Sequence, residues 1–463
     1  MEIIEDIQDD DCIQSLKIVE TFVGCGGSHM GFSKAGFKTL FINDIDKAMI
    51  ETIKLNTDLK ENQYYIGSLE DVSKTMIEKK TGEKNITTDL LCGGVVCKGF
   101  SLAGVRNPSD VRNYLYLEQL RLVKELQPKV SVIENVPQFK TTKILRETTD
   151  NKKVIEDLRD LYNQKKSNNG KKTSHKCDMN ILTKELELLN INIKNLEEQL
   201  KLSRYSVFDD IHRIYNDLGY TVYHKILTCA NYGDYTCRKR LFIIAIRNDI
   251  HKKCGEFIYP NPTHNKNGEE GLPKWKTVNE CLKQIDYDDK NHPNNDNDNK
   301  PMNHRPATVR RFKYLPEGGT LANVDQKDLP EDLRNKKIFH SRGANKRLAG
   351  YKCCPTLVPG HSAFPIHPRE HRSLTIREGA CLTGFPPNYI FYGSHTKRCE
   401  QIGNAIPVNV AHQLGLRIKE YLNNDNYKNM EIVELKKLCE KKILKLNKEQ
   451  LITFLNMKLN PIL

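Results

Sequence analysis

The residues best suited to chemistry lie in one glycine-rich stretch, Leu90-Leu91-Cys92-Gly93-Gly94-Val95-Val96-Cys97-Lys98-Gly99-Phe100-Ser101. Its apolar start, Asp89 to Cys92, predicts a buried strand that the two glycines end. Cys97 follows the carboxyl end of that strand, where open α/β sheets place their ligands. A thiol in such a loop can act as a nucleophile, although most cysteines are small buried hydrophobic residues. Cys97 is therefore a candidate nucleophile that needs support from the rest of the chain.

Three further segments place polar side chains at the ends of predicted elements. They are Ile133-Glu134-Asn135-Val136 after an apolar strand, Cys237-Arg238-Lys239-Arg240 before another strand, and Cys399 to Pro407 at the start of a late helix. Taken singly, they fit a strand-end salt bridge, a charged edge and the beginning of a helix. Only their joint order along the chain is specific.

A glycine turn near the N-terminus suggests a nucleotide-like ligand. Val23-Gly24-Cys25-Gly26-Gly27 follows a predicted strand, and Asp44 lies 20 positions beyond Gly24. Nucleotide-binding folds place a ribose-binding carboxylate at this distance from the turn. An ordinary βα turn explains the same pattern, so the turn alone leaves both interpretations open.

The elements that must position these residues alternate between strand and helix. Helices are predicted over residues 28–36, 113–126 and 404–422, and strands over residues 16–22, 39–42, 64–66, 89–92, 130–133, 221–227 and 241–246. This alternation predicts an α/β fold with a doubly wound, mostly parallel sheet.

A Lys-, Asn- and Gln-rich insert over residues 140–204 interrupts this alternation. Val154, Leu158 and Leu161 precede a turn cluster at Asn168-Asn169-Gly170-Lys171-Lys172, and a narrow apolar seam follows it at Leu182, Leu186, Leu189, Ile193, Leu196 and Leu200. The spacing predicts an antiparallel helical hairpin outside the sheet, with a shorter first helix and its reversal at Asn168–Lys172. Packing of the longer helix against a second copy is the alternative. We expect replacement of residues 146–202 by a short linker to preserve folding and base chemistry.

Composition bounds the function classes. The 463 residues carry a net charge of +13, which favours a polyanionic partner, although a diffuse positive surface also fits. No run of 18 apolar residues occurs and the acidic N-terminus lacks the apolar core of a signal peptide, so an intracellular protein without a membrane span is expected. The 14 cysteines include no Cys-x-x-Cys pair, which indicates reduced thiols and no metal site.

In order and spacing, these segments resemble the motifs of the DNA cytosine-5 methyltransferase family. The matching segments are Phe22 to Gly27, Cys97 to Ser101, Glu134-Asn135-Val136, Arg238-Lys239-Arg240, Arg372 to Glu378 with Gly384-Phe385-Pro386, and Gln401 to Asn404. They run in family order from residue 18 to about residue 420. Only the insert and the C-terminal tail lie outside the resemblance.

The resemblance implies a fold, a cofactor and a set of roles. The fold would be that of S-adenosylmethionine-dependent methyltransferases, with a smaller target-recognition domain and a helical insert. Cys97 would add to carbon 6 of a flipped-out cytosine, Glu134 would stabilise ring nitrogen 3, and Arg238 and Arg240 would hold the base oxygen O2. Residues expected at the DNA are Ser101, Arg106 and Arg112, and those expected at the cofactor are Phe22, Gly24, Gly26, Gly27, Asp44, Ile45, Ser68 and Asn404.

The resemblance also implies a domain plan and partners. A catalytic domain would span residues 13–247 with the insert at 140–204, a recognition domain 248–397, a closing helix 398–424, and a small basic helical tail 428–463. Double-stranded DNA is the expected substrate, bound by a monomer or by a dimer formed through the insert. The setting would be intracellular, at DNA, in a restriction–modification system.

Departures from the family pattern leave two alternatives. Val95-Val96 replaces the family's Pro-Pro, Lys98 its Gln and Thr236 the Gln before the arginines, and Ser68 stands where the family has an adenine-binding Asp. Proline stiffens a turn, so these changes would suit a catalytically weakened or silent DNA-binding relative. The tRNA-methylating branch is the other alternative, but its Cys-Phe-Thr motif is absent and Gly99-Phe100-Ser101 matches the DNA type.

Overall fold

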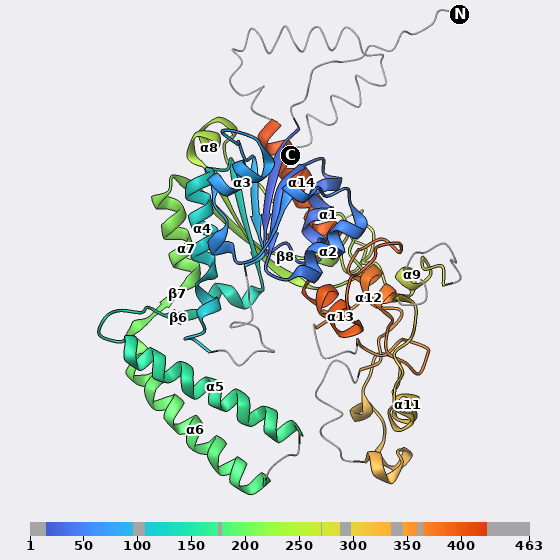
Figure 1. The fold of residues 1–463 in the computed structure, drawn as a ribbon. Coiled ribbons are helices and arrows are strands. Elements are labelled where there is room, and N and C mark those ends of the chain that lie inside the picture. The colour runs from blue at the N-terminus through green and yellow to red at the C-terminus, as the bar shows by residue number, and fades with distance from the viewer. Residues whose placement is uncertain are drawn as a thin grey trace, which may run out of the picture.

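A seven-stranded sheet forms the centre of the protein, in the order β3-β2-β1-β4-β5-β9-β8 (Figure 1). The computed structural model describes residues 15–95, 107–174, 178–269, 271–287, 298–334, 346–358 and 364–423. The strands are β1 (Lys17–Thr21), β2 (Lys38–Asp44), β3 (Tyr64–Ile66), β4 (Leu90–Gly93), β5 (Val130–Asn135), β8 (Tyr220–Thr228) and β9 (Lys239–Arg247). Neighbours among β1 to β5 pair in parallel, whereas β9 runs antiparallel to β5 and to β8. The predicted doubly wound, mostly parallel sheet is confirmed.

Helices cover both faces of the sheet, which explains why the central strands β4 and β5 are buried along their whole length. Along β5, Val130 and Val132 join the core on the face of α1 (Gly27–Lys34), α8 (Asn248–Cys254) and α14 (Val408–Asn423), and Ile133 joins the opposite core. That opposite face carries α3 (Lys74–Thr81), α4 (Leu115–Leu126) and α7 (Val207–Asp217), while α2 (Lys47–Asn56) packs beside β2.

The late helix predicted over residues 404–422 begins four residues later than expected. Helix α13 (His395–Asn404) ends first, and Ala405 then adopts extended backbone angles before α14 starts at Val408. Pro407 explains the break, because its ring disfavours helical geometry at the residue before it.

The insert forms a helical hairpin, α5 (Lys152–Ser174) and α6 (Met179–Gln199), joined to the body by the two-stranded sheet of β6 (Lys143–Leu145) and β7 (Arg204–Ser206). The predicted reversal at Asn168–Lys172 and the shorter first helix are wrong, because α5 is helical through those residues. The apolar seam on α6 extends from Leu182 to Leu200, and covering it requires a first helix of similar length. Asn168 also donates from Nδ2 to Glu185 on α6 at 3.2 Å.

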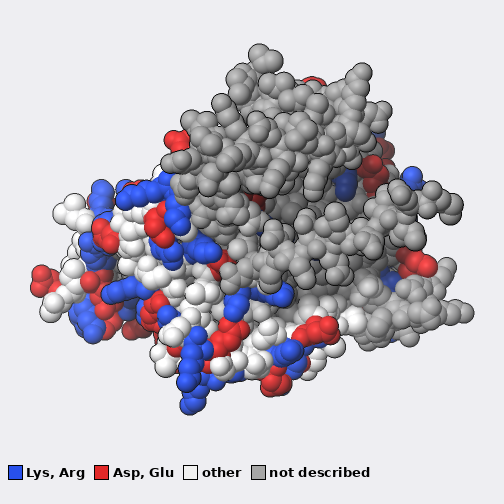
Figure 2. All heavy atoms as spheres, turned by 90° about the horizontal axis from the view of Figure 1, so that it is seen from above, with Lys and Arg blue, Asp and Glu red and all other residues white. Residues whose placement is uncertain are grey.

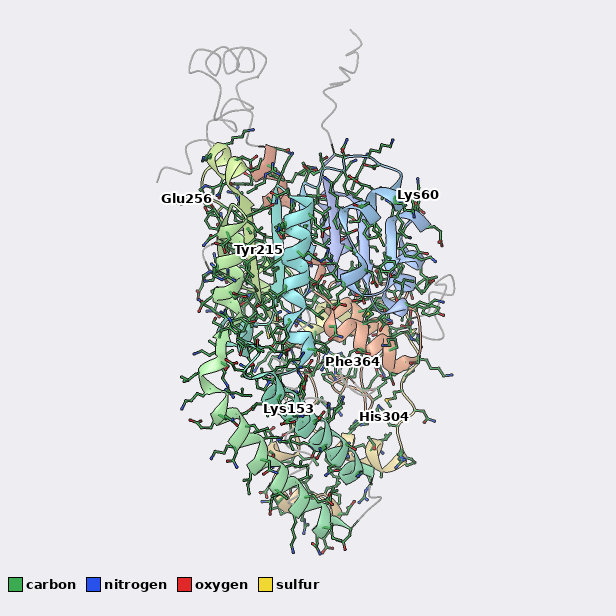
Figure 3. All side chains as sticks on the ribbon, turned by 60° about the vertical axis from the view of Figure 1, so that its left-hand side comes forward. Lys60, Lys153, Tyr215, Glu256, His304 and Phe364 are labelled. Carbon is green, nitrogen blue, oxygen red and sulfur yellow. The ribbon has the colours of Figure 1, made fainter. Side chains whose placement is uncertain are left out.

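The recognition region is built from short helices and loops. Its helices include α9 (Val278–Leu282), α11 (Pro306–Lys313) and α12 (Ile376–Leu382), and one small core gathers around Phe312, Leu321 and Ile366. Phe257 and Tyr259 still pack in the core of the sheet, so the chain leaves the catalytic body after them. Figures 1 and 3 show the hairpin and the region of α11 extending from the same end of the molecule.

The described surface carries mixed charge on the face seen from above. On the face seen in Figure 2, the described Lys and Arg side chains are interspersed with Asp and Glu, so the excess positive charge does not form one patch there. None of the helices within the described ranges has the length and apolar character needed to cross a membrane.

Candidate active site

The glycine turn after β1 has a packed side and an open side. Phe22, Gly24 and Gly26 all have positive φ angles, of 49°, 57° and 90°. A Cβ at Gly27 would lie 2.1 Å from the carbonyl oxygen of Ile406, so the turn rests against the segment before α14. A Cβ at Gly24 would meet no atom within 4 Å. The turn therefore leaves free space above Gly24, where a ligand could approach the backbone.

Asp44, at the end of β2, is held beside this open space. Its Oδ2 accepts a hydrogen bond from the Gly24 amide at 2.9 Å, and its Oδ1 accepts one from the Asp46 amide at 2.9 Å. Burial raises the pKa of the Asp44 carboxyl, and the amide donors act against that shift. The next residue, Ile45, is 72% exposed although it is a large apolar side chain. The carboxylate and an uncovered apolar side chain thus lie next to the open turn.

Ser68 and an unpredicted residue, Asn43, organise the neighbouring strand end. Ser68 caps a short 3-10 helix by accepting from the Glu70 amide at 3.4 Å. The buried Asn43 donates from Nδ2 to the carbonyls of Tyr65 and Gly67, both at 3.1 Å. Because these partners lie about 20 residues apart in the sequence, no local signal identifies Asn43.

Two further sets of contacts, which the sequence does not reveal, hold the glycine turn in place. The buried Glu20 on β1 accepts from Ser28 Oγ at 3.1 Å and lies 2.7 Å from His29 Nδ1, both on α1. Tyr389 donates its hydroxyl to the carbonyl of Cys25 at 2.7 Å. The late Gly-Phe-Pro segment therefore supports the turn through the tyrosine that follows it.

A buried ion pair lies at the end of β5. Glu134 Oε1 is 2.7 Å from Arg240 Nε, and both side chains are at most 10% exposed. Burial raises the pKa of the Glu134 carboxyl, whereas the Arg240 charge and hydrogen bond lower it. A Cβ at Gly94 would lie 3.6 Å from Glu134 Oε2, so that oxygen faces the chain segment that leads to Cys97.

Asn135 connects β5 to the same segment. It donates from Nδ2 to the carbonyl of Val95 at 3.0 Å and accepts from the Val136 amide at 2.8 Å. Val95 is itself buried in the core. The position that lacks the family's proline is therefore fixed by packing and a side-chain hydrogen bond. Cys97, Ser101 and Arg106 lie outside the described residues.

Arg238 is placed differently from Arg240. Its guanidinium donates to the carbonyl of Gly403 at 2.7 Å and to that of Asn404 at 3.4 Å, which links the start of β9 to the end of α13. The two arginines thus have different partners within the chain, since Arg240 contacts Glu134 and Arg238 contacts the end of α13. Their joint role at the base stays a prediction. The side chain of Asn404 is exposed there.

Arg112 lies in the 3-10 helix η3 (Val111–Tyr114). It pairs with Asp110 at 2.6 Å, and its side chain is 46% exposed. The late Arg372 forms a fork with the buried Glu378, with two contacts of 2.8 Å, and Thr375 caps α12. Both arginines are thus paired with a carboxylate, but Arg112 is half-exposed, whereas Arg372 is mostly covered.

Comparisons with known proteins agree with this arrangement. The family model of C-5 cytosine-specific DNA methylase matches residues 16–175 and 188–420. The chain is 28% identical over 421 residues to the Type II methyltransferase M.Eco47II of Escherichia coli, covering 88% of this chain and 80% of that protein. It is 30% identical over 422 residues to the Type II methyltransferase M.PspPI of Psychrobacter sp., covering 89% and 80%.

The fold has a solved counterpart. A crystal structure of an E. coli protein encoded within a prophage and assigned as a DNA modification methyltransferase superimposes with a TM-score of 0.55 at 20% identity, covering 88% of this chain and all of that one. The family model covers most of the chain and includes the turn, the buried ion pair and the late motifs. The chain therefore belongs to the C-5 cytosine-specific DNA methylase family and is a DNA cytosine-5 methyltransferase.

Proposed function

We propose that this chain transfers a methyl group from S-adenosylmethionine to carbon 5 of cytosine in double-stranded DNA, with Cys97 as the covalent nucleophile. The observation that carries the proposal is the buried Glu134–Arg240 pair, which lies beside the segment of Val95 that leads to Cys97. Carbon 5 of cytosine is too electron-poor to attack a methyl group directly. Addition of the Cys97 thiolate to carbon 6 converts the ring into an enamine that can. After methyl transfer, the proton on carbon 5 leaves and the Cys97 thiolate is expelled from carbon 6, which restores the ring.

Glu134 fits the role of the group at ring nitrogen 3. Negative charge builds on that nitrogen when the thiolate adds, and a carboxyl group that shares a proton there stabilises it. Burial favours the neutral form of Glu134, which makes a proton available. Arg240 limits that effect and fixes the orientation of the carboxyl group, so Glu134 can donate without losing its position.

The open side of the glycine turn fits the cofactor. Gly24 leaves room for close approach, the Asp44 oxygens can accept ribose hydroxyls, and the exposed Ile45 offers an apolar surface to an adenine ring, with Phe22 as the expected second surface. Gly26, Gly27, Ser68 and Asn404 are proposed to complete this site. When bound, S-adenosylmethionine supplies the electrophilic methyl group.

The DNA is proposed to lie at the end of the molecule from which the hairpin and the recognition region extend (Figure 1). The target carbon is unreachable inside a duplex, so the cytosine must leave the base stack. Ser101, Arg106 and the half-exposed Arg112 are proposed to contact the DNA. Binding as a monomer is proposed, within an intracellular restriction–modification system like those of the Type II relatives.

The test is methyl transfer itself. Purified protein is incubated with cofactor labelled in its methyl group and with duplexes that contain or lack cytosine. We expect label only in cytosine-containing DNA, recovered as 5-methylcytosine. The Cys97→Ser variant serves as the control, since it should bind cofactor and DNA but transfer no methyl group. Transfer by Cys97→Ser at the wild-type rate would contradict the assignment of the nucleophile.

A further inference from the structure

The segment that follows the Cys97 stretch is anchored where the described chain resumes. Asn107 Oδ1 accepts from the amide and the hydroxyl of Ser109 at 2.9 and 2.7 Å, and Asn113 Nδ2 donates to the Asn107 carbonyl at 2.9 Å. Ser109 is fully buried. This segment leads through η3 into α4, so its position fixes one end of the chain that carries the nucleophile.

The hairpin insert contacts this segment directly. Arg159 on α5 donates from Nε to the carbonyl of Ser109 at 2.7 Å, and its Nη2 pairs with Glu147 at 3.1 Å. The Leu145 amide donates to the Pro108 carbonyl at 3.4 Å, and the Tyr114 hydroxyl donates to the Leu145 carbonyl. Residues of the insert thus hold the segment at three carbonyl or hydroxyl groups.

The root of the hairpin, which comprises β6, β7 and the ends of α5 and α6 next to them, is held by a buried cluster and by hydrogen bonds. Leu145, Ile155, Leu158 and Leu200 form a buried cluster between β6, α5 and the end of α6. Asn151 Nδ2 donates to the Arg146 carbonyl at 2.9 Å and to Ser203 Oγ at 3.0 Å, which joins the two connections of the insert. Figure 3 shows Lys153 at the end of α5 that lies next to the catalytic body, while the rest of the hairpin extends away.

We propose that Arg159 is a positioning residue for methyl transfer, which acts by holding the Ser109 carbonyl and thereby the segment that joins the nucleophile's loop to α4. This inference rests on the proposed function. Under this inference, the root of the insert is needed for the full rate of methyl transfer, and only the distal half of the hairpin can be removed without loss of that rate. The expectation that residues 146–202 can be replaced as a unit is revised accordingly, because such a replacement would remove both Arg159 and its partner Glu147.

The test uses Arg159→Met, which keeps an unbranched apolar stem but removes all donors, and Arg159→Lys, which restores one donor. Arg204→Ala is the matched control, since Arg204 pairs with Glu197 at 3.4 Å at the same root and has no contact with Ser109 among those described. Small misplacements of reacting groups cost about 10- to 100-fold in rate, and we expect that loss in the single-turnover rate of Arg159→Met. Cofactor affinity should stay close to wild type, whereas the melting temperature should fall because the buried Ser109 carbonyl loses its donor. Arg159→Lys should recover part of the rate.

A second variant separates the root from the distal hairpin. Replacing residues 166–189 by a short turn keeps Arg159 and the buried cluster, and it should retain the wild-type single-turnover rate. An Arg159→Met rate equal to that of wild type, or an equal loss in Arg204→Ala, would overturn the inference. If Arg159→Met melts early, the comparison of Arg159→Lys with Arg204→Ala at matched stability decides the question. Failure of the wild-type protein to methylate cytosine would instead contradict the proposed function.

Discussion

Replacing Arg240 by an uncharged residue should change both the stability of the protein and its rate of methyl transfer, and a second substitution can restore the first without the second. Glu134 and Arg240 lie 2.7 Å apart and are at most 10% exposed. Loss of one partner from a buried ion pair leaves the other charge uncompensated, which costs about 3–5 kcal/mol. Arg240→Met should therefore lower the free energy of unfolding by about that amount at neutral pH. The same variant should lose methyl transfer.

The pH dependence of this loss identifies its cause. Without Arg240, burial alone raises the pKa of Glu134 in the folded state, so the folded protein binds a proton more tightly than the unfolded chain does. The penalty should therefore be largest above that raised pKa and shrink as the pH falls and the carboxyl group becomes neutral. Urea unfolding at several pH values measures this.

A double variant supplies the control. Glu134→Gln/Arg240→Met removes both charges, and replacing a buried pair by neutral groups is often close to neutral for stability. We expect the double variant to regain most of the lost stability while staying inactive in single-turnover assays. Wild-type stability of Arg240→Met at every pH, or methyl transfer by the double variant, would refute the account of this pair.

Three further predictions follow from the same geometry. Asn135→Ala should cost about 1–3 kcal/mol, because the buried Val95 carbonyl loses its donor. It should also slow single-turnover methylation, and an unchanged rate would count against this role of Asn135. Gly27→Ala should prevent stable folding, since its Cβ would lie 2.1 Å from a backbone oxygen. Gly24→Ala, at an open position with φ of 57°, should fold with a cost of about 1–2 kcal/mol but bind cofactor more weakly by calorimetry; equal melting temperatures would contradict this pair. Asp234 is buried with a pKa raised by burial to about 8 from 3.8, so wild-type stability should fall by up to about 1.4 kcal/mol per pH unit between those values. Asp234→Asn should show a flatter pH profile in urea unfolding, and parallel profiles would show that Asp234 does not titrate there.

The sheet could be predicted from the sequence because its signal is local and repeated. The start of β5, Val130 to Ile133, is apolar apart from Ser131, and a short run of this kind after Pro128 is typical of a strand covered on both faces. Its observed bounds, Val130–Asn135, extend the prediction by two residues. Glu134 could be placed at the strand end for the same reason, since the polar residues begin where the apolar run stops.

The hairpin shows where local signals fail. The Asn168–Lys172 cluster is typical of a turn, and a glycine within a helix costs about 1 kcal/mol relative to alanine. Burial of the apolar seam of α6 outweighs that cost. Leu182 and Leu186 are buried only because α5 continues far enough to cover them. Contacts between distant segments also had no local signal, as in the hydrogen bond from Tyr389 to the Cys25 carbonyl and in the position of Arg238 at the end of α13.

Trapping of the covalent adduct tests the central claim most directly. A duplex in which 5-fluorocytosine replaces the target cytosine should block release of the enzyme, because the fluorine at carbon 5 cannot leave as the proton does after methyl transfer. With cofactor present, the wild-type protein is expected to form a denaturation-resistant complex with this DNA, and peptide mapping should place the modification on Cys97. Cys97→Ser should form none. A wild-type protein that methylates cytosine without any such complex, or an adduct on another residue, would contradict the account.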